Sequence, residues 1–320
     1  MTIGILGGGQ LGRMLALAGY PLGVHCRFLD PEPHLPVTPL AEHIQGDYDD
    51  EAVLQDFVAG LTAVTYEFEN VPVAAARWLA AHVPVYPPPQ ALEMAQDRLN
   101  EKRLFQRLGI PTPPFAPVTT VTELRQAVAV LGLPAVLKTR RFGYDGKGQY
   151  VLREPTDIAR AWALSGGVPL ILEEFVPFER EVSLVAVRDR HGHAAYYPVT
   201  ENQHREGILR LSLAPAPGWT TGLQACAESY MQRVLETLEY VGVLAIEFFQ
   251  CAGKLLANEM APRVHNSGHW TIEGAETSQF ENHLRAVVGL PLGAPIARGQ
   301  SAMLNIIGSF PQLPEVLTIP

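Results

Sequence analysis

Apolar runs of four to six residues alternate with amphipathic stretches over the first 95 residues of the chain. This alternation is typical of βαβ units, in which buried strands are joined by helices that cover a parallel sheet. We therefore predict an α/β domain with a parallel sheet over residues 1–95. The predicted elements are, in chain order, strand 3–6, helix 10–18, strand 24–29, helix 50–58 and strand 63–66.

Three consecutive prolines at 87–89 end this first pattern. Residues 90–108 then have the period of one amphipathic helix that ends at a glycine. A strand at 135–138, a glycine-rich loop and a strand at 170–176 follow. The remainder of the chain is rich in predicted strands. The predicted domain boundaries are 1–95, 96–180 and 181–320.

One apolar strand of the third unit, residues 241–249, contains a single acid, Glu247. A buried carboxylate is costly unless a positive group compensates it. A turn centred on Gly253 would bring Glu259 opposite Glu247, and such a pair can hold a divalent ion. A two-residue turn would shift the register by one and bring Asn258 opposite Glu247 instead. The pattern favours Mg²⁺, with Mn²⁺ as a second option, at Glu247 and Glu259.

Composition narrows the class of partner. The 320 residues are 47% hydrophobic and have a formal net charge of -9, without a run of lysine or arginine. We therefore expect small anions as partners and no nucleic acid. No stretch of about twenty apolar residues is present, so no membrane association is expected. Three widely separated cysteines and a start without leader-like features favour a protein of the reducing cytoplasm.

The glycine motif at 7–12 directly follows the first predicted strand and begins the first predicted helix. Its G-x-G-x-x-G spacing, with Asp30 closing the next strand, is typical of dinucleotide-binding folds. Helix N-terminal amides there can bind phosphate, although the glycines can also serve only a tight turn. Gln10 and Glu67 are candidate ligand-binding residues, and a solvated loop acid is the alternative for Glu67.

A second glycine-rich loop, residues 143–148, follows the strand that ends at Lys138. Its backbone amides and the nearby cations Arg140, Arg141 and Lys147 suit a polyphosphate. No Gly-Lys-Ser/Thr sequence ends the loop, so we expect a hairpin lid rather than a Walker A helix start. An ordinary Asp-Gly turn with solvated charges is the alternative.

Polar residues also follow two further strand ends. Glu173 and Glu174 end one strand, and the alternation of side chains directs only one of them to a given cleft. Backbone groups of the next two residues, 175–176, could meet an adenine edge, and Glu181 could bind a ribose hydroxyl. Exposed acids at a strand end are the alternative interpretation.

Arg263, His265 and Asn266 form a polar cluster just beyond the predicted acid pair. A guanidinium and hydrogen-bonding side chains in this order can surround an acyl or carboxy phosphate. The expected task of this cluster is therefore stabilisation of an anion.

Taken together, these residues resemble the ATP-grasp ligases, in which two α/β subdomains enclose MgATP. More narrowly, the chain resembles the N5-carboxyaminoimidazole ribonucleotide synthases over essentially its whole length. This second resemblance rests on four motifs: Gly-Gly-Gln-Leu-Gly-Arg at 8–13, Asp97-Arg98 with Lys102, Gly-Tyr-Asp-Gly-Lys-Gly at 143–148, and Glu-Met-Ala-Pro-Arg-Val-His-Asn-Ser-Gly-His-Trp at 259–270.

The resemblance implies a Rossmann-like pre-ATP-grasp domain followed by an ATP-grasp fold. It also implies a homodimeric, ADP-forming carbon–nitrogen ligase of purine biosynthesis that activates bicarbonate as carboxyphosphate and carboxylates 5-aminoimidazole ribonucleotide. The glycine loop at 143–148 would close over the phosphates, because carboxyphosphate hydrolyses readily. The N-terminal domain would then bind the ribonucleotide and not nicotinamide.

The resemblance assigns roles to individual residues. ATP would be bound by Arg98, Lys138, Gly143, Tyr144, Asp145, Gly146, Lys147, Gly148, Gln149, Glu173, Glu174, Phe175, Val176, Glu181, His204 and Asn258. Mg²⁺ would be bound by Glu247 and Glu259, and the ribonucleotide by Gln10, Leu11 and Glu67. The catalytic residues would be Tyr144, Asp145, Arg263, His265 and Asn266.

Two departures from the family pattern bear on ribonucleotide binding. Members usually continue past the position of Pro320 with a basic element that helps to bind the ribonucleotide phosphate. We therefore expect either a shortened form or phosphate binding by other basic residues. Lys147 replaces an arginine common in that loop, which keeps the charge but loses a bidentate fork.

Three other functions are compatible with part of the pattern. The first is another ATP-grasp ligase such as formate-dependent glycinamide ribonucleotide transformylase, against which the His-Asn-Ser-Gly-His-Trp segment at 265–270 argues. The second is an NAD-dependent oxidoreductase, which would leave Lys138, Glu247 and Glu259 without a role. The third is a catalytically silent binding protein with the same fold.

Overall fold

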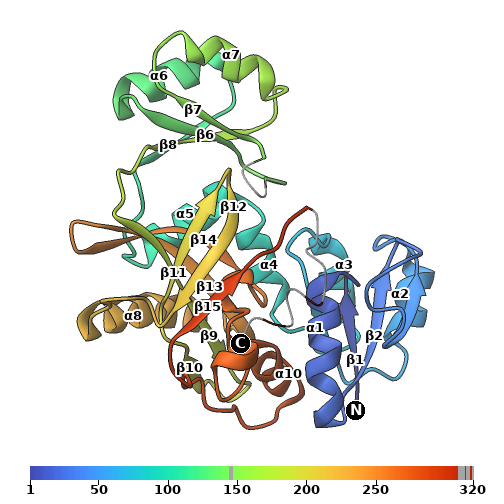
Figure 1. Cartoon of the computed structure of the whole chain (residues 1–320). Coiled ribbons are helices and arrows are strands. Elements are labelled where there is room, and N and C mark those ends of the chain that lie inside the picture. Colours follow the sequence, from blue (N-terminus) through green and yellow to red (C-terminus); the bar gives the residue numbers. More distant parts are fainter. Residues whose placement is uncertain (144–146, 309–313, 315–317, 319–320) are drawn as a thin grey trace.

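The N-terminal unit is a four-stranded parallel sheet in the order β3-β2-β1-β4. The structure is a computed structural model, and it describes residues 1–143, 147–308, 314 and 318 (Figure 1). The buried strands β1 and β4 explain the continuous apolar runs in the sequence, because helices cover a parallel sheet. The elements are β1 (Thr2–Leu6), α1 (Gln10–Gly19), the short η1 (Tyr20–Leu22), β2 (His25–Asp30), β3 (Glu42–Gln45), α2 (Glu51–Val58), β4 (Ala63–Tyr66) and α3 (Val73–Ala80).

The single helix predicted over 90–108 is wrong, because two helices occupy this range: α4 (Pro89–Ala95) and α5 (Arg98–Arg107). Asp97 separates them. Its backbone is extended, its side chain accepts the Leu99 amide at 2.9 Å, and its carboxylate pairs with Arg140 at 2.5 Å. An aspartate is polar whether it caps a helix or lies within one, so the hydrophobic period alone does not reveal the break.

The small unit is an antiparallel sheet in the order β5-β8-β6-β7, with α6 and α7 on one side (Figure 1). β6 and β7 pair in a hairpin around the second glycine loop, with Lys138 opposite Gln149, which confirms the expected hairpin. The strand predicted over 170–176 ends two residues earlier, at Glu174. The elements are β5 (Phe115–Val118), α6 (Val121–Leu131), β6 (Ala135–Thr139), β7 (Gln149–Leu152), α7 (Asp157–Leu164) and β8 (Leu170–Glu174).

The large unit is a seven-stranded sheet with the path β14-β13-β9-β11-β12-β15, in which β10 pairs with β9. Alternate residues of β13 enter two cores: Leu244 and Ile246 pack with α8, whereas Val243 and Ala245 pack with α10 and with residues of the N-terminal unit. The elements are β9 (Arg180–Arg188), β10 (Ala194–Tyr196), β11 (Thr200–Arg205), β12 (Ile208–Ala214), α8 (Thr221–Thr237), β13 (Gly242–Cys251), β14 (Lys254–Ala261), the short η2 (Asn266–Gly268), α9 (Thr271–Gly274), α10 (Gln279–Val288) and β15 (Ser301–Leu304).

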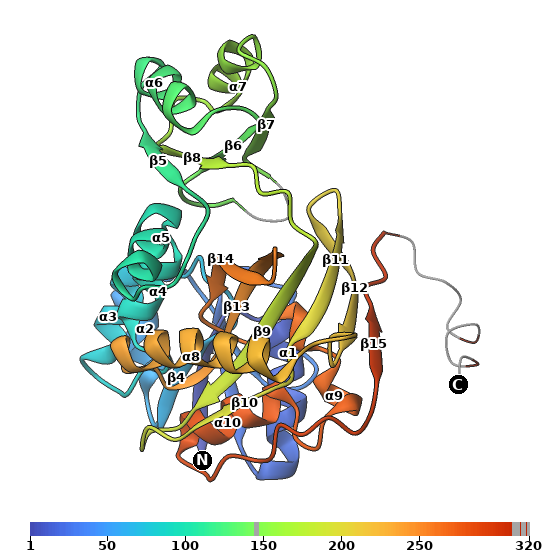
Figure 2. The same cartoon turned by 90° about the vertical axis from the view of Figure 1, so that its left-hand side faces the viewer.

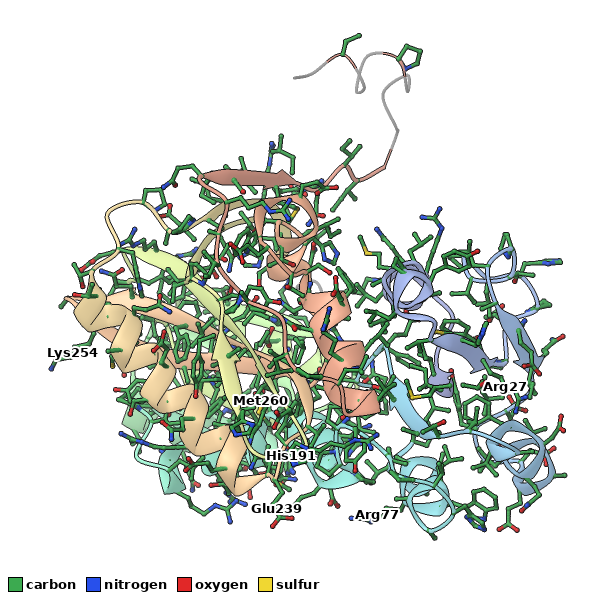
Figure 3. The ribbon with its side chains drawn as sticks, turned by 90° about the horizontal axis from the view of Figure 1, so that it is seen from below. Arg27, Arg77, His191, Glu239, Lys254 and Met260 are labelled. Atoms are coloured by element: carbon green, nitrogen blue, oxygen red, sulfur yellow. The ribbon has the colours of Figure 1, made fainter. Side chains whose placement is uncertain are left out.

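The three units are arranged around one junction. The small sheet lies above the large sheet in Figure 2, with α5 and the ends of β13, β14, β11 and β12 below it. Seen from below, the N-terminal unit with Arg27 and Arg77 lies beside the large unit, on the side away from Lys254 (Figure 3). Leu104 and Phe105 of α5 belong to the core of the large sheet, whereas the core of the small sheet is drawn from residues 118–172. No described helix is both long and apolar enough to cross a bilayer.

Candidate active site

A cavity of about 530 Å³ lies where the three units meet. Glu67, Lys147 and Gly148 are described but do not line it, and the predicted residues Tyr144, Asp145 and Gly146 lie outside the described residues. The predicted site residues that line the cavity come from all three units: Gln10, Leu11, Arg98, Lys138, Gly143, Gln149, Glu173, Glu174, Phe175, Val176, Glu181, His204, Glu247, Asn258, Glu259, Arg263, His265 and Asn266.

The β13–β14 hairpin brings Glu247 opposite Glu259 by a route that the sequence did not predict. Its turn has two residues, since Cys251 pairs with Lys254, and this register alone would place Asn258 opposite Glu247. A β-bulge between Glu247 and Phe248 in the pairing shifts the register by one residue and restores the Glu247–Glu259 pair. The expected pairing is therefore present, and the bulge supplies it.

The two carboxylates have different electrostatic surroundings. Burial and the neighbouring Glu259 charge raise the pKa of Glu247 to about 7. Although burial opposes ionisation of Glu259, the Arg98 guanidinium 2.5 Å away lowers the pKa of that carboxyl to about 2. Two negative charges directly opposite each other disfavour ionisation of both carboxyls, so a cation between them would stabilise both carboxylates.

The donor atoms around this pair fit a hard divalent cation. Glu247 and Glu259 supply carboxylate oxygens, and the buried Asn258 Oδ1 has no hydrogen-bond partner among the described residues. Oxygen ligands of this kind suit Mg²⁺, which normally retains waters or substrate phosphates as its other ligands. Among the described residues, no three His, Cys, Asp or Glu side chains form a group that could hold a metal ion.

Lys138 lies at the end of β6, and its charge is compensated within the protein. Lys138 Nζ donates to Glu173 Oε2 at 2.9 Å, and Lys102 Nζ lies 3.4 Å from the same oxygen. Burial opposes ionisation of Glu173, but the two lysines lower the pKa of its carboxyl to about 2. Glu173 is buried and Glu174 is exposed, but both border the cavity, so the expectation that only one of them would reach a given cleft is wrong.

The cavity lining also contains a second pair of polar residues and an aromatic pair. His204 Nδ1 lies 2.8 Å from Glu181 Oε2. Burial alone would lower the pKa of His204, but this contact with Glu181 raises it. Phe178 and Phe249 stack with ring centroids 4.8 Å apart and line the cavity. The Phe175 amide, which we expected to be available to a base, donates to the Pro134 carbonyl.

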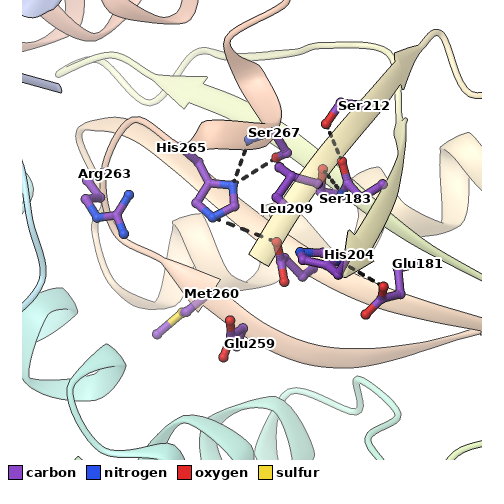
Figure 4. Close-up of polar contacts among 12 residues, drawn as sticks. Glu181, Ser183, His204, Leu209, Ser212, Glu259, Met260, Arg263, His265 and Ser267 are labelled. Carbon is purple, nitrogen blue, oxygen red and sulfur yellow. Dashed lines mark hydrogen bonds and ion pairs between the residues drawn. The ribbon is translucent and has the colours of Figure 1, made fainter. Parts of the chain in front are cut away.

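Arg263, His265 and Asn266 line another part of the cavity, and the first two are labelled in Figure 4. Arg263 donates to Glu69. The Ser267 amide donates to His265 Nδ1, so the ring proton is on Nε2, which lies 3.8 Å from Glu247 Oε1. Burial, together with the Arg263 charge, lowers the pKa of His265 to about 3. The positive charge of this cluster is therefore carried by Arg263, and His265 is neutral.

Comparison with known proteins assigns the chain to a family. Residues 1–96 match the ribonucleotide synthetase preATP-grasp domain, and residues 103–280 match the ATP-grasp domain. The chain is 57% identical over 319 residues to the N5-carboxyaminoimidazole ribonucleotide synthase of Pseudomonas aeruginosa, covering 100% of this chain and 88% of that protein. The chain belongs to the N5-carboxyaminoimidazole ribonucleotide synthase family.

Solved structures of this synthase family have the same fold. The N5-carboxyaminoimidazole ribonucleotide synthetase of Thermus thermophilus has a TM-score of 0.95 at 61% identity, over 99% of this chain and 86% of that one. The Aspergillus clavatus synthase in complex with ADP and 5-aminoimidazole ribonucleotide has a TM-score of 0.89 at 30% identity, over 96% of this chain and 82% of that one. The chain is thus an ATP-dependent ligase of the ATP-grasp superfamily, preceded by a parallel pre-ATP-grasp domain.

In this synthase-family chain, the amides of the first glycine motif bind carboxylates of the protein. Gly8 N donates to Asp30 Oδ2 at 2.9 Å, and the amides of Gly9 and Gly12 donate to Glu67. Burial raises the pKa of Glu67, although the hydrogen bonds from these amides act in the opposite direction. Because the chain's own acids occupy the amides that would bind a pyrophosphate, this loop does not fit a dinucleotide in the usual way.

We expected Glu67 to face the same ligand as Gln10, but it does not line the cavity. Its side chain is only 6% exposed, and the helix N-terminus of α1 satisfies it, since a buried carboxylate requires hydrogen-bond donors. Glu69, two residues on, lines the cavity and holds Arg263. Sequence reasoning missed Glu69, because nothing in the pattern distinguished the two acids that follow β4.

Proposed function

We propose that the chain catalyses the ATP- and bicarbonate-dependent carboxylation of 5-aminoimidazole ribonucleotide to N5-carboxyaminoimidazole ribonucleotide. One observation carries the proposal: the acid pair and the Arg263–Asn266 cluster line the same cavity as Gln10 and Leu11 of the N-terminal glycine motif. A nucleotide held at the acids and a second substrate held at the glycine motif would thus meet in a single enclosed space. The Aspergillus clavatus relative, described with ADP and 5-aminoimidazole ribonucleotide, supports this pair of ligands.

The metal belongs to the proposal. Glu247 and Glu259, with Asn258 Oδ1 beside them, would hold Mg²⁺ or Mn²⁺. Bound there, the ion would offset the charge of the ATP phosphates during transfer. Arg98, beside Glu259, and Lys138 would contribute positive charge to the same phosphates, and Glu181 and His204 would bind the nucleoside.

Bicarbonate requires activation because it is a poor electrophile. Transfer of the γ-phosphoryl group to a bicarbonate oxygen gives ADP and carboxyphosphate, whose carboxyl carbon has phosphate as its leaving group. The amine then attacks that carbon, directly or after release of carbon dioxide, and loses one proton as phosphate departs. Arg263 would stabilise the transferred anion, while neutral His265 and Asn266 would orient it through hydrogen bonds.

The remaining expectations are proposals of the same kind. We propose a cytoplasmic homodimer in which residues 1–95 bind the ribonucleotide, residues 96–180 cover the nucleotide, and residues 181–320 supply the metal and anion sites. The three free cysteines agree with a reducing compartment. We also propose catalytic roles for Tyr144 and Asp145 near the amine, and ATP binding by the rest of the 143–149 loop.

The test is a substrate-dependent assay of ADP release with the purified chain and Mg²⁺. We expect ADP to form when bicarbonate and 5-aminoimidazole ribonucleotide are both supplied, with one N5-carboxylated product per ADP. Parallel reactions contain formate with glycinamide ribonucleotide, or NADH with a panel of ketones. ATP turnover that is unaffected by 5-aminoimidazole ribonucleotide would contradict the proposal, and turnover in either parallel reaction would favour the corresponding other function.

A further inference from the structure

The bulge that aligns the acid pair lies at an outer edge of the large sheet. Among the described strands, β14 pairs only with β13, and its other edge faces α5 and Pro111. The Ala257 amide donates to the Pro111 carbonyl at 2.7 Å, and the Ala257 carbonyl accepts from Lys102 Nζ at 3.3 Å. Further along the strand, the Met260 amide donates to Glu101 Oε1 at 2.6 Å.

The spacing of these contacts depends on the bulge. In a regular strand, the backbone groups that face one edge recur at every second residue. The outward groups bound here belong to residues 257 and 260, which are three apart. One residue is therefore extra between them, and Asn258 and Glu259 together face Glu247. Without the bulge, the amide of residue 260 would point toward β13 and away from α5.

The α5 side chains that make these contacts share one face of the helix. Arg98, Glu101 and Lys102 are at positions i, i+3 and i+4, and Arg98 binds the carboxylate of Glu259 itself. Glu101 is 2% exposed and Lys102 is 0% exposed. Burial of such groups is unfavourable unless each is hydrogen bonded, and the edge of β14 supplies partners for both.

We propose that Glu101 is a positioning residue for the acid pair. By accepting the Met260 amide, its carboxylate oxygen holds β14 in the bulged register that sets Glu259 opposite Glu247. Lys102 fixes the other side of the bulge through the Ala257 carbonyl. The role of the acid pair as a metal site rests on the proposed function, whereas the effect of Glu101 on the register rests on the contacts alone.

Two substitutions separate the reach of this side chain from its acid group. Glu101→Gln keeps an acceptor oxygen at the same distance and removes the acid group, whereas Glu101→Asp keeps the acid group and withdraws the oxygen. We expect Glu101→Asp to weaken Mn²⁺ binding in the presence of ADP about tenfold, as loss of groups that orient metal ligands does. The same variant should increase hydrogen exchange of the Met260 amide. Electron paramagnetic resonance measures Mn²⁺ binding, and NMR measures hydrogen exchange. In both measurements, Glu101→Gln should resemble the unmodified chain.

Leu284→Ala is the matched control, because Leu284 is buried in α10 away from the cavity lining. It should lower the urea midpoint and leave the Mn²⁺ dissociation constant unchanged. Equal losses of Mn²⁺ binding in the Gln and Asp variants, or none in the Asp variant, would overturn the inference. If the Asp variant does not fold, exchange in Glu101→Gln decides: protection of the Met260 amide supports the inference, and its loss refutes it. An unmodified chain that binds no Mn²⁺ would refute the proposed function, while the exchange data still decide the register.

Discussion

At the scale of the residue, the same type of side chain has different tasks according to what lies opposite it. Glu67 accepts backbone amides, Glu173 pairs with lysines, and Glu259 pairs with Arg98 while it faces another acid. Of these three buried or partly buried acids, only Glu259 has a like charge as its cross-strand partner. Opposed carboxylates weaken a sheet unless a cation joins them, so this acid is the one whose replacement should affect turnover most specifically.

The Glu259→Gln variant tests the metal assignment. It removes one of the two carboxylates but keeps the side-chain volume, so the fold should persist. We expect Mg²⁺-dependent ADP formation to fall by about 100-fold or more, because even groups that only orient metal ligands are worth 10–100-fold in metal affinity or activity. Circular dichroism and steady-state kinetics measure the two properties. A folded variant with full turnover would refute Glu259 as a metal ligand.

At the scale of the element, the β13–β14 hairpin combines a tight turn with a bulge. Ala252 and Gly253 have φ values of 49° and 73°, which are the left-handed values of a type I′ turn. This turn sets one register, and the bulge corrects it by one residue before the acids. The turn is exposed and its two residues do not line the cavity, so its effect on stability can be tested apart from function.

Replacement of Ala252 by Asn should stabilise the protein. Alanine at positive φ costs about 1 kcal/mol or more, and asparagine tolerates this conformation better. We expect Ala252→Asn to raise the free energy of unfolding by about 0.5–1 kcal/mol, measured by urea denaturation, with unchanged kinetics of ADP formation. Gly253→Ala should lower it, since it places a second β-carbon in the left-handed region. Lower stability in Ala252→Asn would contradict this account of the turn.

At the scale of the whole molecule, α10 joins the N-terminal unit to the large sheet. His283 of α10 accepts the Val243 amide of β13 at Nδ1, at 3.1 Å, and lies 2.8 Å from Thr65 Oγ1 of β4. Because the backbone amide can only donate, the ring proton is on Nε2 and points to Thr65. Burial lowers the pKa of His283 to about 4, so this link requires a neutral imidazole.

Stability should therefore fall as the pH is lowered from about 6.5 to 4. The unfolded chain takes up the His283 proton below its ordinary pKa of 6.5, whereas the folded chain takes it up only near 4. This difference corresponds to about 3 kcal/mol lost across the window. In His283→Gln, the dependence of the unfolding free energy on pH should be smaller by about that amount. Thr65→Val, which removes the partner but no titrating group, should lower stability without changing the slope, and an unchanged slope in His283→Gln would refute the link.

The sequence by itself determined the α/β class, the parallel N-terminal sheet and the hairpin around the second glycine loop. Local patterning suffices for these features, because the hydrophobic period and the turn residues act over short distances. The resemblance to the family then implied the chemistry and many of the cavity-lining residues. Even the acid pair was predicted, although for a symmetrical turn and not for a two-residue turn with a bulge.

Only the tertiary structure decided how each charged group is compensated. It divided the helix at Asp97, used Glu67 to cap α1, placed Glu69 in the cavity and brought Glu101 to the edge of β14. These outcomes depend on partners between 43 and 194 positions away in the chain. Burial makes the hydrogen bonds of charged groups obligatory, but the sequence does not state which distant group meets the requirement.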